Sequence, residues 1–238
     1  MEETRPKWKI LSGSWLKIIA MLTMLIDHLL KSVLVGNKAF FTPFVSLFGL
    51  NISMALIASI LGRIAFPLYC FLLTEGFIHT RDRKKYGRNL LLFALISELP
   101  WNYFISGNLL YGKQNVFFTL FLGYLILCAL DRIEKKPLQS TVCILIIVAF
   151  SVVLRADYGY VGLAIIIAMY VLRRIAVARA VVCIGLFSSG WRAGLAFIPI
   201  TLYNGERGFI KGRFGKYVCY AFYPIHLLVL GLINHLVI

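Results

Sequence analysis

The stretch WLKIIAMLTMLIDHLLKSVLV, residues 15–35, decides the fold class of this chain. Its length matches the roughly 20 apolar residues that an α-helix needs to cross the hydrocarbon core of a bilayer. The adjacent pair Asp27 and His28 lies inside it, and an acid at the centre of a membrane helix costs roughly 2.5 to 3.5 kcal/mol on insertion scales. Such groups line polar cavities and mark functional sites. The stretch therefore predicts a membrane helix that takes part in chemistry or transport.

The composition of the whole chain supports the same fold class. Its 238 residues are 60% hydrophobic and 15% charged, whereas soluble domains are about 25% charged. The apolar runs lack the strict alternation that is typical of membrane β-barrel strands. We predict an all-α fold, a polytopic membrane helical bundle with about nine transmembrane helices. The first stretch is longer than the apolar part of a signal peptide and no small-residue cleavage site follows it, so we expect it to be retained.

The apolar runs set the predicted spans. Residues 40–51 are apolar but short, and they could form an interfacial or re-entrant segment or a separate short span. Two further predicted spans are also short and could form a hairpin or a broken helix buried in protein; these are residues 176–187 and 191–202. The nine predicted spans are residues 15–35, 52–79, 88–105, 116–130, 138–154, 160–172, 176–187, 191–202 and 217–237.

The basic residues set the predicted orientation. With a cytoplasmic N-terminus, most of the 25 lysines and arginines fall in cytoplasmic segments, as the positive-inside rule requires. These residues account for the net charge of +15, so we expect the lipid bilayer and not nucleic acid as a partner. We predict a cytoplasmic segment at residues 1–14 and a single transmembrane domain at residues 15–238. The expected location is the cell (inner, cytoplasmic) membrane, crossed several times.

The five cysteines lie singly within apolar segments, and none forms a CxxC pair. The sequence therefore indicates neither a disulfide framework nor a thiolate metal site, and we expect no metal.

Lys17 and His28 are eleven residues apart and would lie on nearly the same face of one helix, about 16 Å apart along its axis. A cation near the cytoplasm and a base deep in the membrane suit a long anionic donor that enters from the cytoplasm. Asp27 would point away from His28, and we expect it to pair with a cation on another helix, for which Arg63 lies at a suitable depth. The alternative is a structural polar bridge between helices.

The segment GRIAFP, residues 62–67, places Arg63 within an apolar run, where it needs an acidic partner or an anionic ligand. Pro67 should kink the helix and free backbone groups to line a cavity. At the cytoplasmic end, Glu75 and His79 are one helical turn apart, either as a local pair or as part of a site. The loop that follows either marks topology or binds phosphate; its cations are Arg81, Arg83, Lys84, Lys85 and Arg88.

Glu98 lies in the segment ISELPWN, residues 96–102, beside the helix-breaking Pro100. It could orient an imidazole, accept a proton or neutralise Arg63. Trp101 and Asn102 are candidate substrate-binding residues, and Asn102 shares a helix face with Glu98.

The last predicted span begins with a cluster of tyrosines and Pro224. Tyr223 and His226 are neighbours on one face, and both are candidate substrate-binding residues. His226 is either a second cavity-lining group or an interhelical hydrogen-bonding residue. On the outer side, residues 155–158 either form a loop salt bridge or touch an acceptor.

The order of these motifs resembles the TraX family of membrane proteins, which is associated with N-terminal acetylation of conjugative pilin. The resemblance covers most of the N-terminal half and the last helix, whereas residues 139–202 add little. It rests on KIIAM (residues 17–21) with DH (27–28), GRIAFP (62–67), EGFIHTR (75–81), Tyr86, SELP (97–100) and FYPIHL (222–227).

TraX-like proteins are similar to a wider integral-membrane acyltransferase superfamily, in which a basic residue, ten intervening residues and a histidine mark the first span. Lys17 and His28 fit this spacing, with lysine where arginine is commoner. The resemblance implies a cytoplasmic acyl-CoA, acetyl-CoA or another short acyl-CoA, and an acceptor at or beyond the outer face. It also implies a catalytic role for His28 and site roles for Arg63, Glu75, His79 and Glu98.

Together these observations predict an acyl-CoA-dependent N- or O-acyltransferase that uses direct transfer, because no serine or cysteine is obviously paired with His28. A proton-coupled transporter or flippase is the alternative, and a non-catalytic assembly factor is a third class. The acceptor is open between a peptide amine, a glycan hydroxyl and a small lipophile. The expected catalytic residues are His28, Asp27, Arg63 and Glu98. The expected donor-binding residues are Lys17, Glu75, His79, Arg81, Arg83, Lys84 and Lys85.

Overall fold

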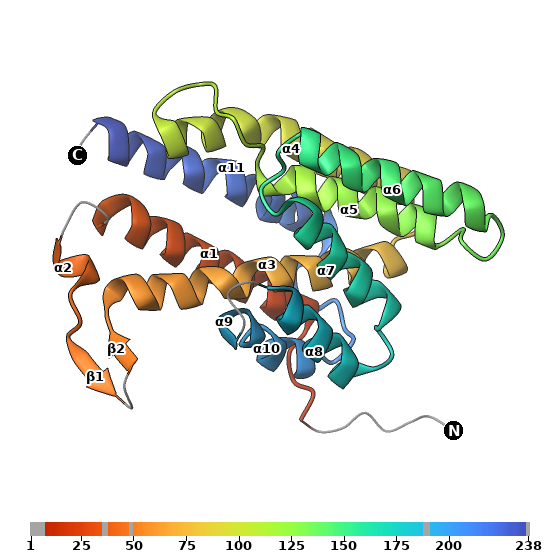
Figure 1. Ribbon diagram of the computed structural model, residues 1–238, viewed down its shortest axis with the longest axis horizontal. Coiled ribbons are helices and arrows are strands. Elements are labelled where there is room, and N and C mark those ends of the chain that lie inside the picture. The colour runs from red at the N-terminus through yellow and green to blue at the C-terminus, as the bar shows by residue number, and fades with distance from the viewer. Residues whose placement is uncertain (1–7, 35–37, 48–49, 188–190, 237–238) are drawn as a thin grey trace. The chain divides into compact units, whose positions relative to one another are not determined.

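The computed structural model describes residues 8–34, 38–47, 50–187 and 191–236 (Figure 1). Within these ranges the regular structure is helical except for one short hairpin, so the predicted all-α fold class is confirmed. The helices are α1 (Gly13–Leu34), α2 (Lys38–Phe41), α3 (Met54–His79), α4 (Arg83–Ser106), α5 (Val116–Leu130), α6 (Pro137–Val153), α7 (Gly159–Val171), α8 (Ala176–Leu186), α9 (Trp191–Gly194), α10 (Phe197–Thr201) and α11 (Gly212–Leu236).

Three of the described helices, α1, α3 and α11, are long and apolar enough to cross a membrane by length and composition. Helices α5 to α8 are apolar but shorter, and α4 coincides with the third predicted span. Most predicted spans therefore correspond to one helix each, while the count of about nine membrane crossings stays a prediction.

The broken-helix alternative agrees with the structure of residues 191–202, and residues 40–51, whose membrane topology stays a prediction, contain part of a short helix and of a hairpin. Residues 191–202 do not form one span, because α9 ends at Gly194 and the chain restarts as the short helix α10. This break agrees with Pro199, which has no backbone N–H and is tolerated in the first turn of α10. Within residues 40–51 the chain forms α2 and an antiparallel hairpin of β1 (Val45–Leu47) and β2 (Leu50–Ile52), in which Val45 pairs with Ile52.

The chain divides into two compact units, which we call the terminal unit and the central unit. The terminal unit comprises residues 1–69 and 189–238, and the central unit comprises residues 70–188. Helix α3 contributes its first part to the terminal unit and its last part to the central unit.

In the terminal unit, α1 packs against α11. Leu16, Ala20 and Leu227 are completely buried, as expected for apolar residues on facing helices. The hydroxyl of Ser14, near the start of α1, donates to the carbonyl of Arg207 at 2.9 Å and accepts from the backbone N–H of Ile210 at 2.8 Å. These bonds attach the beginning of α1 to the segment that leads into α11.

In the central unit, α5 packs against α4, α6 and α7. Gly123 permits the approach of α7, because a Cβ at this position would lie 2.3 Å from Cδ1 of Ile166. Short connections make successive helices antiparallel. The connections at residues 107–115 and 154–158 therefore lie at one end of the unit, and those at residues 131–136 and 172–175 lie at the other.

Candidate functional site

Two histidines from distant parts of the sequence meet in the terminal unit, one on α1 and one on α11. Nδ1 of His28 lies 2.9 Å from Nε2 of His226, and the two rings are nearly parallel, with centroids 5.2 Å apart. The His226 side chain is buried, as is the neighbouring Asp27. Of the two readings offered for His226, the structure confirms the interhelical hydrogen bond.

The hydrogen bonds assign the protons on these rings. Nδ1 of His226 lies 2.8 Å from the carbonyl oxygen of Phe222, one turn earlier on α11. A carbonyl oxygen can only accept, so Nδ1 of His226 carries the proton and its Nε2 is an acceptor. Nδ1 of His28 must then donate to His226. In the neutral pair the basic lone pair of His28 is therefore on Nε2.

The rings of Phe222 and Tyr223 pack around His226. Phe222 stacks on its imidazole with centroids 4.7 Å apart, and Tyr223 meets it edge-on at 5.6 Å. Tyr223 is itself buried. This packing fixes the orientation of His226, and a substrate-binding role for these two residues stays a prediction.

Asp27 has a different partner from the one expected. Its carboxylate oxygens lie 2.6 and 2.8 Å from Nζ of Lys31, one turn further along α1. Residues four apart are neighbours on a helix surface. The prediction for Asp27 was wrong because it considered only cations on other helices. Arg63 lies within electrostatic range of Asp27, and its side chain is exposed.

A glycine on α3, Gly62, allows the Asp27 carboxylate to approach that helix. A Cβ at Gly62 would lie 2.4 Å from Cγ of Asp27, a separation that real atoms do not tolerate. Gly62 immediately precedes Arg63, so one short segment provides both the space and the positive charge. The glycine in GRIAFP was the sequence signal for this contact, and the sequence analysis did not use it.

Lys17 lies on α1 as predicted, three turns before His28. Its side chain is half-buried and lies within electrostatic range of Arg207, which is exposed, and of Cys219 on α11. The terminal unit thus brings together Lys17, Asp27, His28, Arg63 and His226. Tyr223 also lies in the terminal unit, and the other predicted site residues lie in the central unit.

In the central unit, the basic segment after α3 is a loop only as far as Asp82, which corrects the prediction, because all its cations after Arg81 lie on α4. Helix α4 begins at Arg83, because the side chain of Asp82 caps it by accepting from the backbone N–H of Lys85 at 2.8 Å. Arg83 forms an ion pair with Asp131 and lies 4.4 Å from the ring centre of Phe77. The Asp131 carboxylate raises the pKa of the Arg83 guanidinium. Arg81 and Lys84 are exposed.

Glu75 and His79 form the local pair that was one of the two expected alternatives. Nε2 of His79 lies 3.5 Å from Oε2 of Glu75. Arg179, on α8, lies within electrostatic range of Glu75 and was missed as a site residue. Its side chain is only 9% exposed, and its guanidinium lies 5.2 Å from the ring centre of Phe71. The sequence signal for it is an arginine one turn inside a short apolar helix.

Glu98, Trp101 and Asn102 all hold the connection between α4 and α5. Oε2 of Glu98 accepts from Nδ2 of Asn115 at 2.6 Å, Nε1 of Trp101 donates to the carbonyl of Lys113 at 3.1 Å, and Nδ2 of Asn102 donates to the carbonyl of Leu109 at 2.9 Å. The bond between Oε2 of Glu98 and Asn115 was not predicted, and the expectation that Glu98 orients an imidazole, accepts a proton or neutralises Arg63 stays a prediction. Its catalytic role stays a prediction.

In the described ranges, no group of three or more histidine, cysteine or acidic side chains is placed to hold a metal ion. The chemistry that this arrangement offers is proton transfer at His28, together with positive charge near Asp27 and at the basic end of the central unit.

Comparisons with known proteins identify relatives of this chain. A family model described as TraX protein matches residues 12–234. A protein of Dichelobacter nodosus, described as "Probable fimbrial assembly protein FimC, serogroup H1", is 31% identical over 199 residues, which cover 71% of this chain and 79% of the relative. No solved structure matches the chain.

Proposed function

This chain belongs to the TraX family, and on that premise we propose that it is an acyl-CoA-dependent acyltransferase of the cell (inner, cytoplasmic) membrane. It moves an acetyl or other short acyl group from cytoplasmic acyl-CoA to an amine or hydroxyl at or beyond the outer face. The name of the Dichelobacter relative refers to fimbrial assembly, which supports a fimbrial or pilus peptide as one class of acceptor.

The observation that carries the proposal is the hydrogen-bonded pair of His28, which is partly buried, and His226, which is buried. Acyl transfer from a thioester needs a base that removes the acceptor proton during attack. The hydrogen bond to Phe222 leaves Nε2 of His28 as that base. When His28 becomes an imidazolium, its Nδ1–H bond to Nε2 of His226 is charge-assisted and therefore stronger. His226 thus acts as a positioning residue, the part that a carboxylate performs in the serine hydrolase triad.

The reaction proceeds by direct transfer. The acceptor nitrogen or oxygen forms a bond to the thioester carbonyl carbon while Nε2 of His28 takes the acceptor proton. The C–S bond then breaks, and the CoA thiolate leaves and takes the proton from His28. Arg63 supplies positive charge for the oxyanion that develops on the carbonyl. The Asp27 carboxylate attracts the Arg63 guanidinium, and the ion pair with Lys31 orients that carboxylate.

The phosphates of the donor have candidate partners in each unit. In the terminal unit, Lys17 provides a cation on α1. In the central unit, Arg81, Lys84 and Lys85 provide cations around the start of α4. Arg83 is already paired with Asp131, so its part is to fix the beginning of α4. Glu75 and His79 complete the predicted donor-binding set, and Arg179 joins it through its proximity to Glu75.

The test is release of free CoA from acetyl-CoA by the protein reconstituted in vesicles. We expect wild type to release CoA thiol when acceptor is present, and His28→Gln to release none above background. His235→Gln, at the exposed end of α11, is the matched control and should keep wild-type activity. Equal release by wild type and His28→Gln would contradict the proposal.

A proton-coupled transporter or flippase is the second candidate, because a hydrogen-bonded histidine pair between two apolar helices also suits a proton relay. The same vesicles distinguish the two. A transporter would move protons across the membrane together with its substrate and leave the thioester intact. Proton flux without CoA release would replace the acyltransferase proposal by this one.

A further inference from the structure

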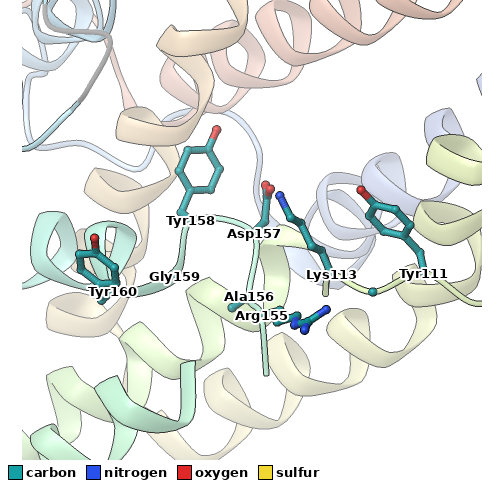
Figure 2. A pocket seen from close by; sticks show the side chains of 9 residues that line it. Tyr111, Lys113, Arg155, Ala156, Asp157, Tyr158, Gly159 and Tyr160 are labelled. Atoms are coloured by element: carbon teal, nitrogen blue, oxygen red, sulfur yellow. The ribbon is translucent and has the colours of Figure 1, made fainter. Parts of the chain in front are cut away.

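A cavity of about 550 Å³ opens at one end of the central unit, where the α4–α5 connection meets the turn between α6 and α7 (Figure 2). This volume lies within the range of roughly 300 to 1,000 Å³ that is typical of small-molecule sites. The lining side chains are those of Tyr111, Lys113, Arg155, Asp157, Tyr158 and Tyr160. The predicted orientation places this end at the outer face of the membrane.

The wall that carries Tyr111 and Lys113 is fixed in position. Trp101 and Asn102 donate to the carbonyls of Lys113 and Leu109, and Asn115 donates to Glu98. Asn115 is completely buried, and its side chain also donates to the carbonyl of Ala94 at 2.8 Å. These bonds order the backbone before any ligand arrives, which favours tight binding.

The opposite wall holds Arg155 in an unusual conformation. Its φ of 53° lies in the left-handed region that residues with a Cβ seldom adopt. The backbone bonds from Gln114 N–H to the carbonyl of Arg155, and from Arg155 N–H to the carbonyl of Val152, each at 3.1 Å, maintain it. Non-glycine residues in this conformation persist where the surroundings impose them, and they cluster at functional sites.

The side chains define the chemistry that the cavity recognises. Lys113 and Arg155 give two positive charges against the single carboxylate of Asp157, and arginine binds carboxylates and phosphates with two parallel hydrogen bonds. The three tyrosines add aromatic faces, which carry partial negative charge and favour the C–H face of a sugar ring. In Figure 2 the side chains of Tyr158, Asp157, Lys113 and Tyr111 point to the same side of the pocket.

We propose that this pocket binds an acidic sugar, one that carries a carboxylate or a phosphate, from the outer face of the membrane. A peptide strand would need backbone groups to pair with, but Gln114 N–H and the Arg155 carbonyl already bond to each other. This proposal rests on the proposed function in one respect, namely that the bound sugar is the acceptor or part of it. Binding of the sugar itself requires no acyl transfer.

The test is binding of digalacturonate to the purified full-length protein in detergent, measured by calorimetry beside its neutral dimethyl ester. We expect wild type to bind the acid at least tenfold more tightly than the ester. Arg155→Asn and Lys113→Gln should each weaken binding of the acid at least tenfold. Asparagine tolerates a left-handed backbone, and the Lys113 carbonyl remains in place for Trp101, so both variants should fold.

Arg132→Gln is the matched control, because it removes the same charge from an exposed residue at the other end of the unit and should leave binding unchanged. The proposal would be overturned if wild type did not bind the acid, or bound the acid and the ester with equal affinity. It would also be overturned if the two pocket variants bound the acid as tightly as wild type, or if an acidic peptide bound more tightly. Phosphorylated disaccharide run in parallel shows which anionic group is preferred. Acetyl-CoA release by the same preparations is measured separately, so that its failure would count against the acyltransferase and not against the pocket.

Discussion

The carbonyl oxygen of Phe222 determines the protonation of two imidazoles through one hydrogen bond. Because His226 donates from Nδ1, it accepts from His28 at Nε2, and His28 keeps its reactive lone pair on the other ring nitrogen. In the other tautomer of His28 the proton would be on Nε2, and this nitrogen would then have no lone pair with which to act as a base. At the scale of single residues, the proposed function therefore needs His226 to position His28.

His226→Leu should lower kcat for acyl transfer by about 10²-fold, the lower range of what a well-placed base contributes, with little change in KM for acetyl-CoA. The leucine leaves Nδ1–H of His28 without its acceptor and frees the ring to rotate. His226→Gln, whose amide oxygen can accept, should recover part of the loss. Steady-state kinetics against His235→Leu provide the control, and a His226→Leu enzyme with wild-type kcat would show that His28 needs no orientation.

Gly62→Ala should destabilise the protein by about 1 to 3 kcal/mol, as overpacking commonly does, because its Cβ would meet the Asp27 carboxylate. Gly185→Ala, on α8, adds a Cβ that meets nothing within 4 Å and should stabilise its helix by about 0.5 to 1 kcal/mol. Unfolding in mixed detergent micelles measures both. Equal stabilities would mean that Asp27 is not packed against α3.

At the scale of elements, the α4–α5 connection depends on Asn115. This residue caps α5 by accepting from Phe117 N–H at 3.0 Å, and its amide donates to Glu98 and to Ala94. One side chain thus starts a helix and attaches it to the preceding helix. Its position immediately before α5 lets it do both.

Asn115→Ala should cost about 1 to 3 kcal/mol, because it removes a cap and leaves buried polar groups without a partner. Amide hydrogens of residues 109–114 should exchange faster in the variant, which mass spectrometry can measure. Asn108→Ala is the control, since the Asn108 side chain is exposed and its amide donates to the carbonyl of the nearby Ser106. If exchange in this connection did not change, Asn115 would not be what orders it.

Helix positions were predictable from sequence to a greater extent than the partners of polar groups. Apolar runs and flanking charges placed α1, α3 and α5 within about two residues, because membrane helices must be long and apolar. The predicted partner of Asp27 was wrong, since a sequence pattern does not reveal which of several cations a carboxylate meets. The break between α9 and α10 was predicted only as one of two alternatives, and the β1–β2 hairpin was not predicted, because short segments depend on the packing around them.

At the scale of the whole molecule, charge predicts the orientation. Exposed cations gather at the start of α4 and in the α5–α6 and α7–α8 connections, with Lys9 before α1, and the positive-inside rule predicts a cytoplasmic position for all of these. The connections at residues 107–115 and 154–158 then face outward. Donor and acceptor would approach from opposite sides of the membrane.

Cysteine labelling in intact cells tests this orientation. In a variant whose five native cysteines are replaced, Asn108→Cys should react with a membrane-impermeant thiol reagent once the outer envelope is open. Lys135→Cys, in the α5–α6 connection, should react only after the inner membrane is permeabilised. The reverse pattern would invert the proposed sidedness of donor and acceptor.

In the proposed reaction His28 is the base that takes the proton from the group attacking a cytoplasmic thioester. Acetyl-CoA binding and hydrolysis by the purified protein measure this most directly. Wild type, His28→Ala and Lys17→Ala are compared, and thermal unfolding shows that each is folded. We predict that acetyl-CoA stabilises wild type against heat, that Lys17→Ala binds it more weakly, and that the slow thioester loss of wild type vanishes in His28→Ala. Folded wild-type protein that neither binds acetyl-CoA nor cleaves it would contradict the account.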